Sequence, residues 1–254
     1  MSAKNNRVGE VSFNKFGSKM TIIEYNNALD MTIVFDDGQY IVKCKYGDFK
    51  RGLIRNVYDK SVYNTGYLGE GEYKTSINGI KTAEYKIWLD MLRRCYDSNY
   101  KKKRPTYSDC KVYEGWHNFQ NFCKWYSENY YEIDDEMMAL DKDILIKGSK
   151  VYSPDTCVFT PQSMNTLLIK RDKSRGDLPI GVTFYKRTNK YMAQCNDRLG
   201  NMAYLGYYDT PEEAFYSYKT FKEKTIKEVA ERYKSQIPSK LYDALVSYEV
   251  EIDD

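Results

Sequence analysis

The sequence predicts an α+β protein, and three observations carry that prediction. Residues 8–56 alternate between apolar and polar side chains, as short β-strands do. The middle of the chain changes to apolar residues three or four positions apart, which is the spacing of one helical face. The last part returns to strand-like stretches and then carries a helix-capping sequence, DTPEEA. Strand-rich ends around a partly helical centre are typical of the α+β class.

Length and composition are those of a folded, soluble protein. The chain has 254 residues, of which 42% are hydrophobic, 30% are charged and only 6 are proline, so it has enough apolar material for real cores. No apolar run is long enough to cross a membrane, and Met1 is followed by the polar SAKNNR where an export signal would be apolar. We therefore expect neither secretion nor a membrane partner.

Charge is distributed unevenly along the chain. The net charge is only +3, but Lys and Arg gather at 93–104 (RRCYDSNYKKKR) and again between 170 and 198, whereas the chain ends in the acidic EVEIDD. A protein that binds phosphates needs only a local basic face, so near-neutrality does not exclude a nucleic-acid partner.

The six cysteines are spread widely and form no CxxC pair. In a chain without an export signal they are expected to be reduced and mostly buried. A zinc site would have to be assembled from widely separated residues, namely Cys95, Cys110, Cys123 or His117, and Cys157. Structural zinc sites usually use short paired spacings, so zinc is not an expected cofactor.

Residues 1–57 predict a small β-barrel. The stretches MTIIEY, MTIVF and YIVKCKYG are strand-like, and the turn DDGQ supplies the positive backbone angle of a tight hairpin. A strand-rich unit with no helical pattern suggests a barrel of the SH3-like kind. A spacer or partner-binding role is the simplest interpretation, and DNA contact is the alternative.

Residues 58–169 predict a central α+β unit, followed by a basic linker at 170–178 (KRDKSRGDL). The first predicted helix of the central unit carries one apolar face, made of Tyr85, Trp88, Leu89, Leu92 and Cys95. The second, in WHNFQNFCKWYSEN, carries another, made of Trp116, Phe119, Phe122, Cys123 and Tyr126. A third helix is predicted to start near Pro161.

Residues 179–254 predict a three-stranded sheet with a packed helix and a C-terminal extension. The strands lie in GVTFYKR, KYMAQCN and MAYLGYY. Asp209 or Thr210 caps the following helix, Pro211 fits its first turn, and two glutamates suit the positive end of its dipole.

This last part resembles the ethylene-response-factor DNA-binding domain, which occurs in plant transcription factors and as an appendage of phage and mobile-element endonucleases. The resemblance covers residues 181–218 and rests on Gly181, Val182, Lys190, Tyr191, Ala193, Leu205, Gly206, Tyr208, Asp209, Thr210, Glu212, Glu213, Ala214 and Tyr218. It implies a sheet lying in the major groove of double-stranded DNA.

The resemblance also implies which residues would meet DNA. They are Thr183, Tyr185, Lys186, Arg187, Lys190, Gln194, Asn196, Arg198 and Tyr204. Several Arg and Trp positions of the family are occupied here by Thr, Tyr, Asn or Met202. This departure weakens reading of base edges more than binding of the phosphate backbone. The alternative is a sheet whose polar face is only solvated.

The central unit resembles phage-encoded proteins related to HNH homing endonucleases. The resemblance covers residues 84–165 and rests on EYKIWLDMLRRCY, YSDCKVYEGWHNFQNFCKW and LDKDILIKGSKVYSPDTCVFTPQSMN. It implies a ββα-metal motif, in which a strand acid and a helix Asn or His hold Mg2+ and a His beside the acid accepts a proton from water. Asp141 falls at the acid position and Asn165 at the helix position.

Lys142 stands where the resemblance places the proton-accepting His, so the motif is degenerate. A lysine ammonium group is ordinarily protonated at neutral pH and cannot accept a proton. Lys142 could instead hold the scissile phosphate, with Asp143 or a metal-bound hydroxide acting as base. On a regular strand, Asp143 would share the face of Asp141 and point away from Lys142. The alternatives are a DNA-binding platform without hydrolysis, or acids that only form a solvated turn.

The basic segment of the central unit is a further candidate for DNA contact. Its cationic residues are Arg93, Arg94, Lys101, Lys102, Lys103 and Arg104. They are expected either to neutralise phosphates in the same cleft or to form a solvated loop.

The expected function is that of a DNA-binding protein of the HNH endonuclease lineage that cuts or nicks DNA with Mg2+, in the cytoplasm of a bacterial host. One alternative is a catalytically inactive phage factor that binds DNA or a host protein, as a regulator or as an inhibitor of a host nuclease or defence complex. Another is an interaction protein that binds no nucleic acid.

Overall fold

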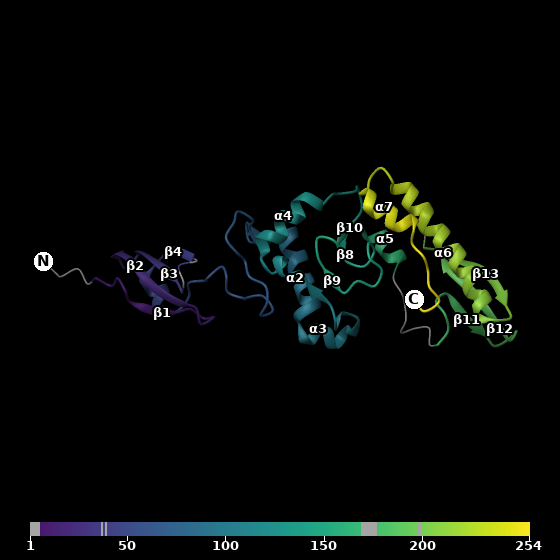
Figure 1. Ribbon diagram of the computed structural model, residues 1–254, viewed down its shortest axis with the longest axis horizontal. Helices are drawn as coiled ribbons and strands as arrows, with labels where there is room; N and C mark the ends of the chain where they lie inside the picture. The colour runs from purple at the N-terminus through teal and green to yellow at the C-terminus, as the bar shows by residue number, and fades with distance from the viewer. Residues whose placement is uncertain (1–5, 37, 39, 169–176, 198–199) are drawn as a thin grey trace. The chain divides into compact units, whose positions relative to one another are not determined.

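A computed structural model describes residues 6–36, 38, 40–168, 177–197 and 200–254 (Figure 1). The chain divides into two compact units, residues 1–128 and 129–254, and each combines helices with small sheets. The predicted α+β class is therefore confirmed. The finer division into 1–57, 58–169, 170–178 and 179–254 stays a prediction, and most of the expected linker lies outside the described residues.

The first unit begins with a four-stranded antiparallel sheet in the order β1-β2-β3-β4. Its strands are β1 (Val11–Phe13), β2 (Lys19–Asn27), β3 (Asp30–Phe35) and β4 (Tyr40–Cys44). The predicted strands are thus present, while two residues of the predicted DDGQ turn, at 37 and 39, lie outside the described residues.

The predicted closure of this sheet into a barrel is wrong for the described residues. Strands β1 and β4 are the two edges, and β1 has only three residues to pair with a neighbour. The apolar face is covered by an unpredicted short helix, α1 (Tyr46–Lys50), whose Phe49 is fully buried among the core residues of β2 and β3. A helix that covers the face removes the need for the sheet to curl onto itself.

The rest of the first unit is mainly helical. It comprises β5 (Ser76–Ile77), β6 (Ile80–Lys81), α2 (Ala83–Tyr96), α3 (Ser98–Lys103), η1 (Pro105–Tyr107), β7 (Lys111–Val112), η2 (Glu114–His117) and α4 (Phe119–Asn129). Both predicted helices of this region are present. The indole of Trp88 on α2 donates to the carbonyl of Trp116 at 2.7 Å and packs against Phe119 of α4, with ring centroids 5.3 Å apart. Met91 is buried where the pattern had favoured Leu89.

The second unit begins with a strand pair followed by a helix. Its first elements are β8 (Met138–Asp141), β9 (Val151–Tyr152), β10 (Val158–Pro161) and α5 (Gln162–Leu167). Strands β8 and β10 are antiparallel, with Asp141 opposite Val158, and α5 packs against both. Pro161 is the residue before the helix and does not lie in its first turn.

The C-terminal sheet and its helix are present as predicted. They consist of β11 (Val182–Tyr185), β12 (Lys190–Asn196), β13 (Met202–Tyr208) and α6 (Pro211–Tyr233), followed by α7 (Ser239–Val246). The strands are antiparallel in the order β11-β12-β13, and α6 covers the inner face. Gly181 has a φ of +77°, and a Cβ there would collide with the Tyr218 ring of α6, so only glycine fits this close approach.

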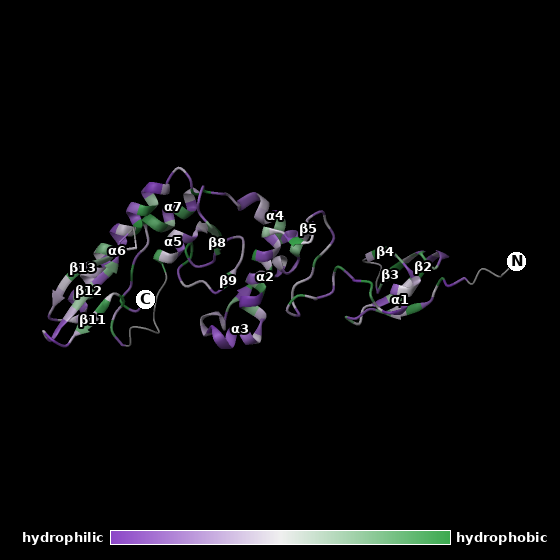
Figure 2. Cartoon of the chain, turned by 180° about the vertical axis from the view of Figure 1, so that it is seen from behind, coloured by the Kyte–Doolittle hydropathy of each residue, from purple (hydrophilic) through white to green (hydrophobic). Residues whose placement is uncertain are grey.

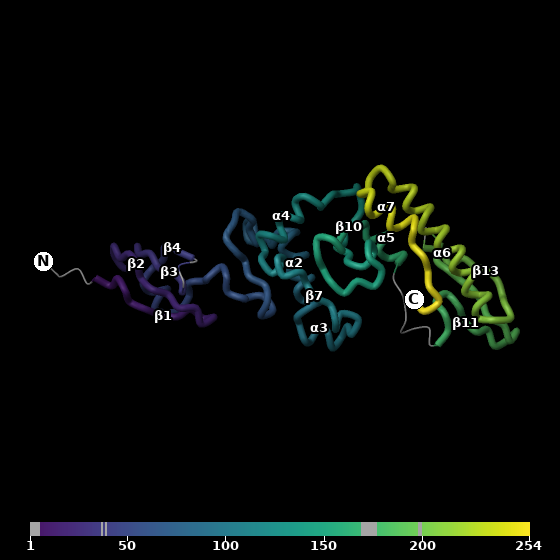
Figure 3. Tube along the Cα trace, in the orientation of Figure 1, coloured from purple at the N-terminus to yellow at the C-terminus, as the bar shows by residue number. Residues whose placement is uncertain are grey.

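Two apolar cores hold the second unit together. One lies between the sheet and α6 and includes Val182, Ala193 and Phe215. The other joins the β8–β10–α5 region to α6 and α7, and its buried members are Ile133, Ile144, Val158, Met164, Ile226, Val229, Ala230, Ile237, Leu241 and Leu245. Figure 3 traces the segment after α7 back along α6 toward the sheet.

None of the described helices combines the length and the apolar character that a bilayer span requires. All six cysteines are free, and all except Cys44 are buried.

Candidate functional site

Asp141 lies at the end of β8, where the strand turns into a loop. Its Oδ1 accepts hydrogen bonds from the backbone N–H groups of Asp143 at 2.8 Å and Ile144 at 2.9 Å. A carboxylate that binds the next two or three N–H groups favours a turn over a continued strand. We call residues 141–150 the Asp141 loop.

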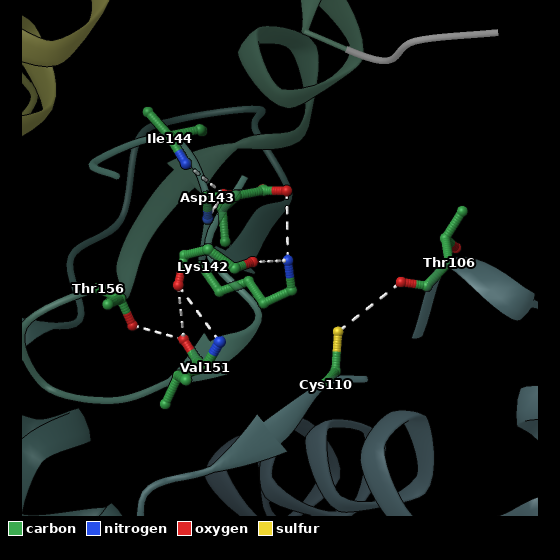
Figure 4. A network of polar contacts seen from close by, with 9 residues as sticks. Thr106, Cys110, Lys142, Asp143, Ile144, Val151 and Thr156 are labelled. Atoms are coloured by element: carbon green, nitrogen blue, oxygen red, sulfur yellow. Dashed lines mark hydrogen bonds and ion pairs between the residues drawn. The ribbon is translucent and has the colours of Figure 1, made fainter. Parts of the chain in front are cut away.

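The side chain of Lys142 is buried within this loop, with 7% of the residue exposed. Its Nζ donates to the carbonyl of Ser149 at 2.6 Å and to Oδ2 of Asp143 at 3.2 Å, as Figure 4 shows for the Asp143 contact. The Tyr152 ring lies 5.9 Å from the same ammonium group. The prediction that Lys142 and Asp143 point to opposite faces is wrong, because the strand ends at Asp141 and regular alternation stops there.

The surroundings of Asp141 disfavour the ionised form of its carboxyl group. Burial, and then the negative charge of Asp143, raise the pKa of Asp141 to about 6. Mg2+ is commonly bound by one or two carboxylates together with water and substrate phosphate oxygens, and this pair fits that requirement. Within the described part of the chain no group of three His, Cys, Asp or Glu residues is assembled, so further ligands would come from an amide such as that of Asn165, from water and from substrate.

Asn165 lies on α5, the helix that packs against β8 and β10. The predicted order of strand, strand and helix therefore brings its element to the strand of Asp141. The Asn165 side chain is half-buried, and no hydrogen bond joins it to Asp141 among the described residues.

The segment after α7 covers the Asp141 loop, which the sequence pattern did not reveal. Lys147 Nζ donates to the carbonyl of Glu249 at 2.8 Å and to Oδ2 of Asp254 at 2.9 Å, and lies 5.5 Å from the ring of Tyr248. Burial raises the pKa of Tyr248 to about 12, and the charges of Asp254, Asp143 and Asp141 add to that rise. The Tyr248 hydroxyl therefore lies in the field of the two loop carboxylates.

His117, the only histidine of the chain, belongs to the first unit and lies half-buried in η2. Its Nε2 is 3.1 Å from the hydroxyl of Tyr96. Burial lowers its pKa, while Glu114 opposes that shift. These contacts are those of a structural histidine at the edge of the helical core.

The basic segment of the first unit divides into paired and exposed residues. Arg93 and Arg94 both bind the carboxylate of Asp90, Arg94 at 2.6 Å. Lys101 donates to the carbonyl of Ser108 at 3.0 Å. The remaining three, Lys102, Lys103 and Arg104, are exposed at and after the end of α3, a helix that is hydrophilic along its length (Figure 2).

The outer face of the C-terminal sheet gathers six of the side chains predicted to meet DNA. Strand pairing places Tyr185 opposite Lys190 and Gln194 opposite Tyr204, and Thr183 and Asn196 share this face. Lys190 is not free there, because its Nζ pairs with Asp209 at 2.9 Å. The two hairpin residues Lys186 and Arg187 are exposed, whereas Arg198 lies outside the described residues.

Two further residues of this outer face were missed by the sequence reasoning, Met192 and Tyr207. The β12–β13 pairing shifts between Ala193 and Gln194, so that Gly206 faces Ala193 and Tyr204 faces Gln194. This bulge on β13 lets Tyr204 and Tyr207 share one face although they are three positions apart. Strict alternation would have placed them on opposite faces. The signal that could have located the bulge is Gly206, whose φ is +128°.

Comparison of the chain with protein-family models, with curated proteins and with solved structures found no match.

Proposed function

We propose that this chain is a DNA-binding protein of the HNH endonuclease lineage, which holds DNA on the outer face of its C-terminal sheet and cuts or nicks it at the Asp141 loop with Mg2+. The observation that supports the proposal most directly is the composition of that outer face. Polar and aromatic side chains from three strands lie together on it, beside an exposed basic hairpin.

The hairpin supplies the charge that DNA binding requires. Lys186 and Arg187 are exposed, and neither forms an ion pair with another described residue. Cations of this kind release counterions when they bind phosphates, and this release gives affinity without sequence preference.

The binding step is tested by charge reversal. We expect the double variant Lys186→Glu/Arg187→Glu to bind a short DNA duplex at least about ten-fold more weakly than the wild type. The slope of log affinity against log salt concentration should fall by the amount that about two phosphate contacts contribute. The matched control, Lys227→Glu/Lys240→Glu, makes the same charge change at exposed positions of the same unit. Equal affinity of the two double variants would contradict the proposal.

The exposed residues at the end of α3 and just after it are a second proposed phosphate contact. Reversal of Lys102, Lys103 and Arg104 to Glu is expected to lower DNA affinity and its salt dependence further. If both quantities stayed unchanged, this segment would be a solvated surface and the sheet alone would carry binding.

The cutting step is assigned to the Asp141 loop. When bound, Mg2+ would stabilise the charge that develops on the phosphate and on the leaving oxygen. Asp141 would supply the carboxylate ligand, with Asn165 as the ligand expected from α5. Lys142 is engaged with Ser149 and Asp143, so its proposed role is to position Asp143, and the exposed carboxylate of Asp143 is the candidate proton acceptor.

A plasmid nicking assay tests this step. Wild-type protein is expected to convert supercoiled plasmid to the open circle with Mg2+ and not with EDTA, and Asp141→Ala is expected to abolish the conversion. Binding of the same plasmid by both proteins provides the control for folding. If both proteins bound DNA and neither cut it, the chain would instead be an inactive binding factor, such as a regulator or an inhibitor of a host nuclease.

A further inference from the structure

We infer that the outer face of the β11–β13 sheet binds the unpaired bases of a single DNA strand, in preference to the edges of stacked base pairs. This inference rests on the proposed DNA-binding function and names the form of DNA that the sheet takes.

A connected group of three tyrosines crosses this face. The rings of Tyr185 on β11 and Tyr207 on β13 have centroids 5.4 Å apart, although β12 lies between their strands. Tyr204 extends the group, with its ring centroid 5.9 Å and its hydroxyl 2.9 Å from those of Tyr207. The Tyr204 hydroxyl also contacts the sulfur of Met192. We call Tyr185, Tyr204 and Tyr207 the tyrosine cluster.

The tyrosine cluster is open to solvent in spite of these contacts. Tyr204 is 58% exposed and Tyr207 40%, and the neighbouring Met202 is 59% exposed. Large apolar side chains that are exposed next to one another often mark a binding surface.

The rings of the tyrosine cluster are better suited to stacking on the faces of bases than to reading the edges of base pairs. Exposed aromatic rings stack on unpaired bases, and each such contact contributes about 1–3 kcal/mol. In a duplex the base faces are already stacked on one another, and side chains must read the edges with Arg, Lys, Asn or Gln. On the described outer face only Gln194 and Asn196 offer side-chain amides, and the one strand cation, Lys190, is paired with Asp209.

The basic hairpin lies beside the cluster and selects a polyanion over an apolar peptide. The hydrogen bond between the Tyr207 and Tyr204 hydroxyls raises the pKa of Tyr207, and the positive charge of Arg187 opposes that rise. Arg187 follows Tyr185 by two residues in the hairpin. Lys186 adjoins it in the same hairpin. Rings for bases beside cations for phosphates form the arrangement that binds single strands with little sequence preference.

Fluorescence anisotropy of the full chain with labelled oligothymidine about 12 nucleotides long tests the inference against a duplex of equal length. We expect at least about ten-fold tighter binding of the single strand by the wild type. Tyr204→Ala/Tyr207→Ala is expected to weaken single-strand binding by about ten-fold or more and duplex binding by less than about three-fold. Tyr204→Phe/Tyr207→Phe keeps the rings and is expected to retain single-strand binding, which separates stacking from loss of folding.

The controls make each outcome decisive. Tyr216→Ala removes a tyrosine of the same unit that is 64% exposed on α6 and should leave both affinities unchanged. Equal affinity of the wild type for both DNA forms, or equal losses in the alanine variant, would overturn the inference while leaving DNA binding intact. Binding of neither form would overturn the proposed function itself. Binding of oligouridine without oligothymidine would overturn the assignment to DNA.

Discussion

The negative charge of Asp141 is largely buried, so it lowers the stability of the folded chain at neutral pH. The pKa of Asp141 in the folded chain is raised to about 6, by burial first and then by Asp143. Because the folded state then binds the proton more tightly than the unfolded chain, the contribution of Asp141 to stability is fully present below about pH 4 and is lost as the pH rises through about 6. We expect Asp141→Asn, whose Oδ1 can still accept the two loop hydrogen bonds, to be more stable than the wild type at pH 7.5 by on the order of 1–3 kcal/mol.

Chemical denaturation between pH 4 and pH 8 measures this difference, which should shrink toward pH 4. The exposed Asp109→Asn serves as a matched control, with no change expected at either pH. If Asp141→Asn were instead less stable than the wild type at pH 7.5, the folded chain would stabilise the ionised Asp141 carboxylate. This result would contradict the argument from burial. Saturating Mg2+ should also reduce the difference in stability between Asp141→Asn and the wild type, because a bound cation favours the ionised carboxylate.

The contacts of Lys142 show that its role could not be inferred from its position in the sequence motif alone. Its ammonium group is committed to the Ser149 carbonyl and to Asp143. We expect Lys142→Met to lose about 1–3 kcal/mol in the free energy of unfolding, because the half-buried Ser149 carbonyl and the Asp143 carboxylate lose their donor. The exposed Lys240→Met should change it by less than about 0.5 kcal/mol. Equal stability of the two variants in urea would remove the positioning role.

At the scale of single elements, α6 begins with a capping box. The Thr210 hydroxyl accepts from the N–H of Glu213 at 3.2 Å, and the Glu213 carboxylate accepts from the N–H of Thr210 at 3.3 Å. Loss of such a cap costs about 1 kcal/mol. Thr210→Ala should therefore lower the thermal midpoint by a few degrees, and Thr210→Ser should restore most of it.

Thr220→Ala is the control on the same helix. Its hydroxyl binds the carbonyl of Tyr216 within the helix, at an exposed position where alanine has the higher helix propensity. This variant should be as stable as the wild type or slightly more stable. If both alanine variants lost the same stability, the loss would come from the helix body and not from the cap.

The elements themselves were largely readable from the sequence, because their signals are local. Alternation located β2, β3 and the three C-terminal strands, and the DTPEEA sequence located the start of α6. What failed depended on contacts between distant residues. The open sheet of the first unit follows from Phe49 covering its face, and the position of Tyr207 follows from a bulge. Neither is encoded in a repeat of two or 3.6 residues.

The residues of the candidate sites could likewise be predicted where the signal is local in sequence, and not where it depends on contacts between distant residues. The resemblance to HNH-related proteins pointed to Asp141 as the motif acid, and the resemblance to the ethylene-response-factor domain pointed to the six outer-face residues. The burial of Lys142 could not be predicted, because it depends on the carbonyl of Ser149 across a turn. The approach of Tyr248 to the loop carboxylates depends on a return of the chain over about a hundred residues, which no local pattern can indicate.

At the scale of the whole molecule, the segment after α7 ties the two cores of the second unit to each other. Tyr248 packs against both cores, and Val250 is buried in the core between the sheet and α6. The backbone of Val250 is held on both sides, since its N–H donates to Glu223 at 2.9 Å and its carbonyl accepts from Lys219 at 2.7 Å. Lys147 fastens the same segment to the Asp141 loop through Glu249.

This arrangement predicts that the sheet and the Asp141 loop unfold together. Val250→Asp would bury a charge without a partner and is expected to lower the stability of the second unit by about 3 kcal/mol or more, in one transition. Hydrogen exchange should then quicken in β11–β13 and in β8 to a similar degree. Ile252→Asp makes the same change two residues later at a side chain that is 45% exposed, and should have little effect. Faster exchange in the sheet alone would mean that the two sites are energetically independent, because the segment would then anchor only one of them.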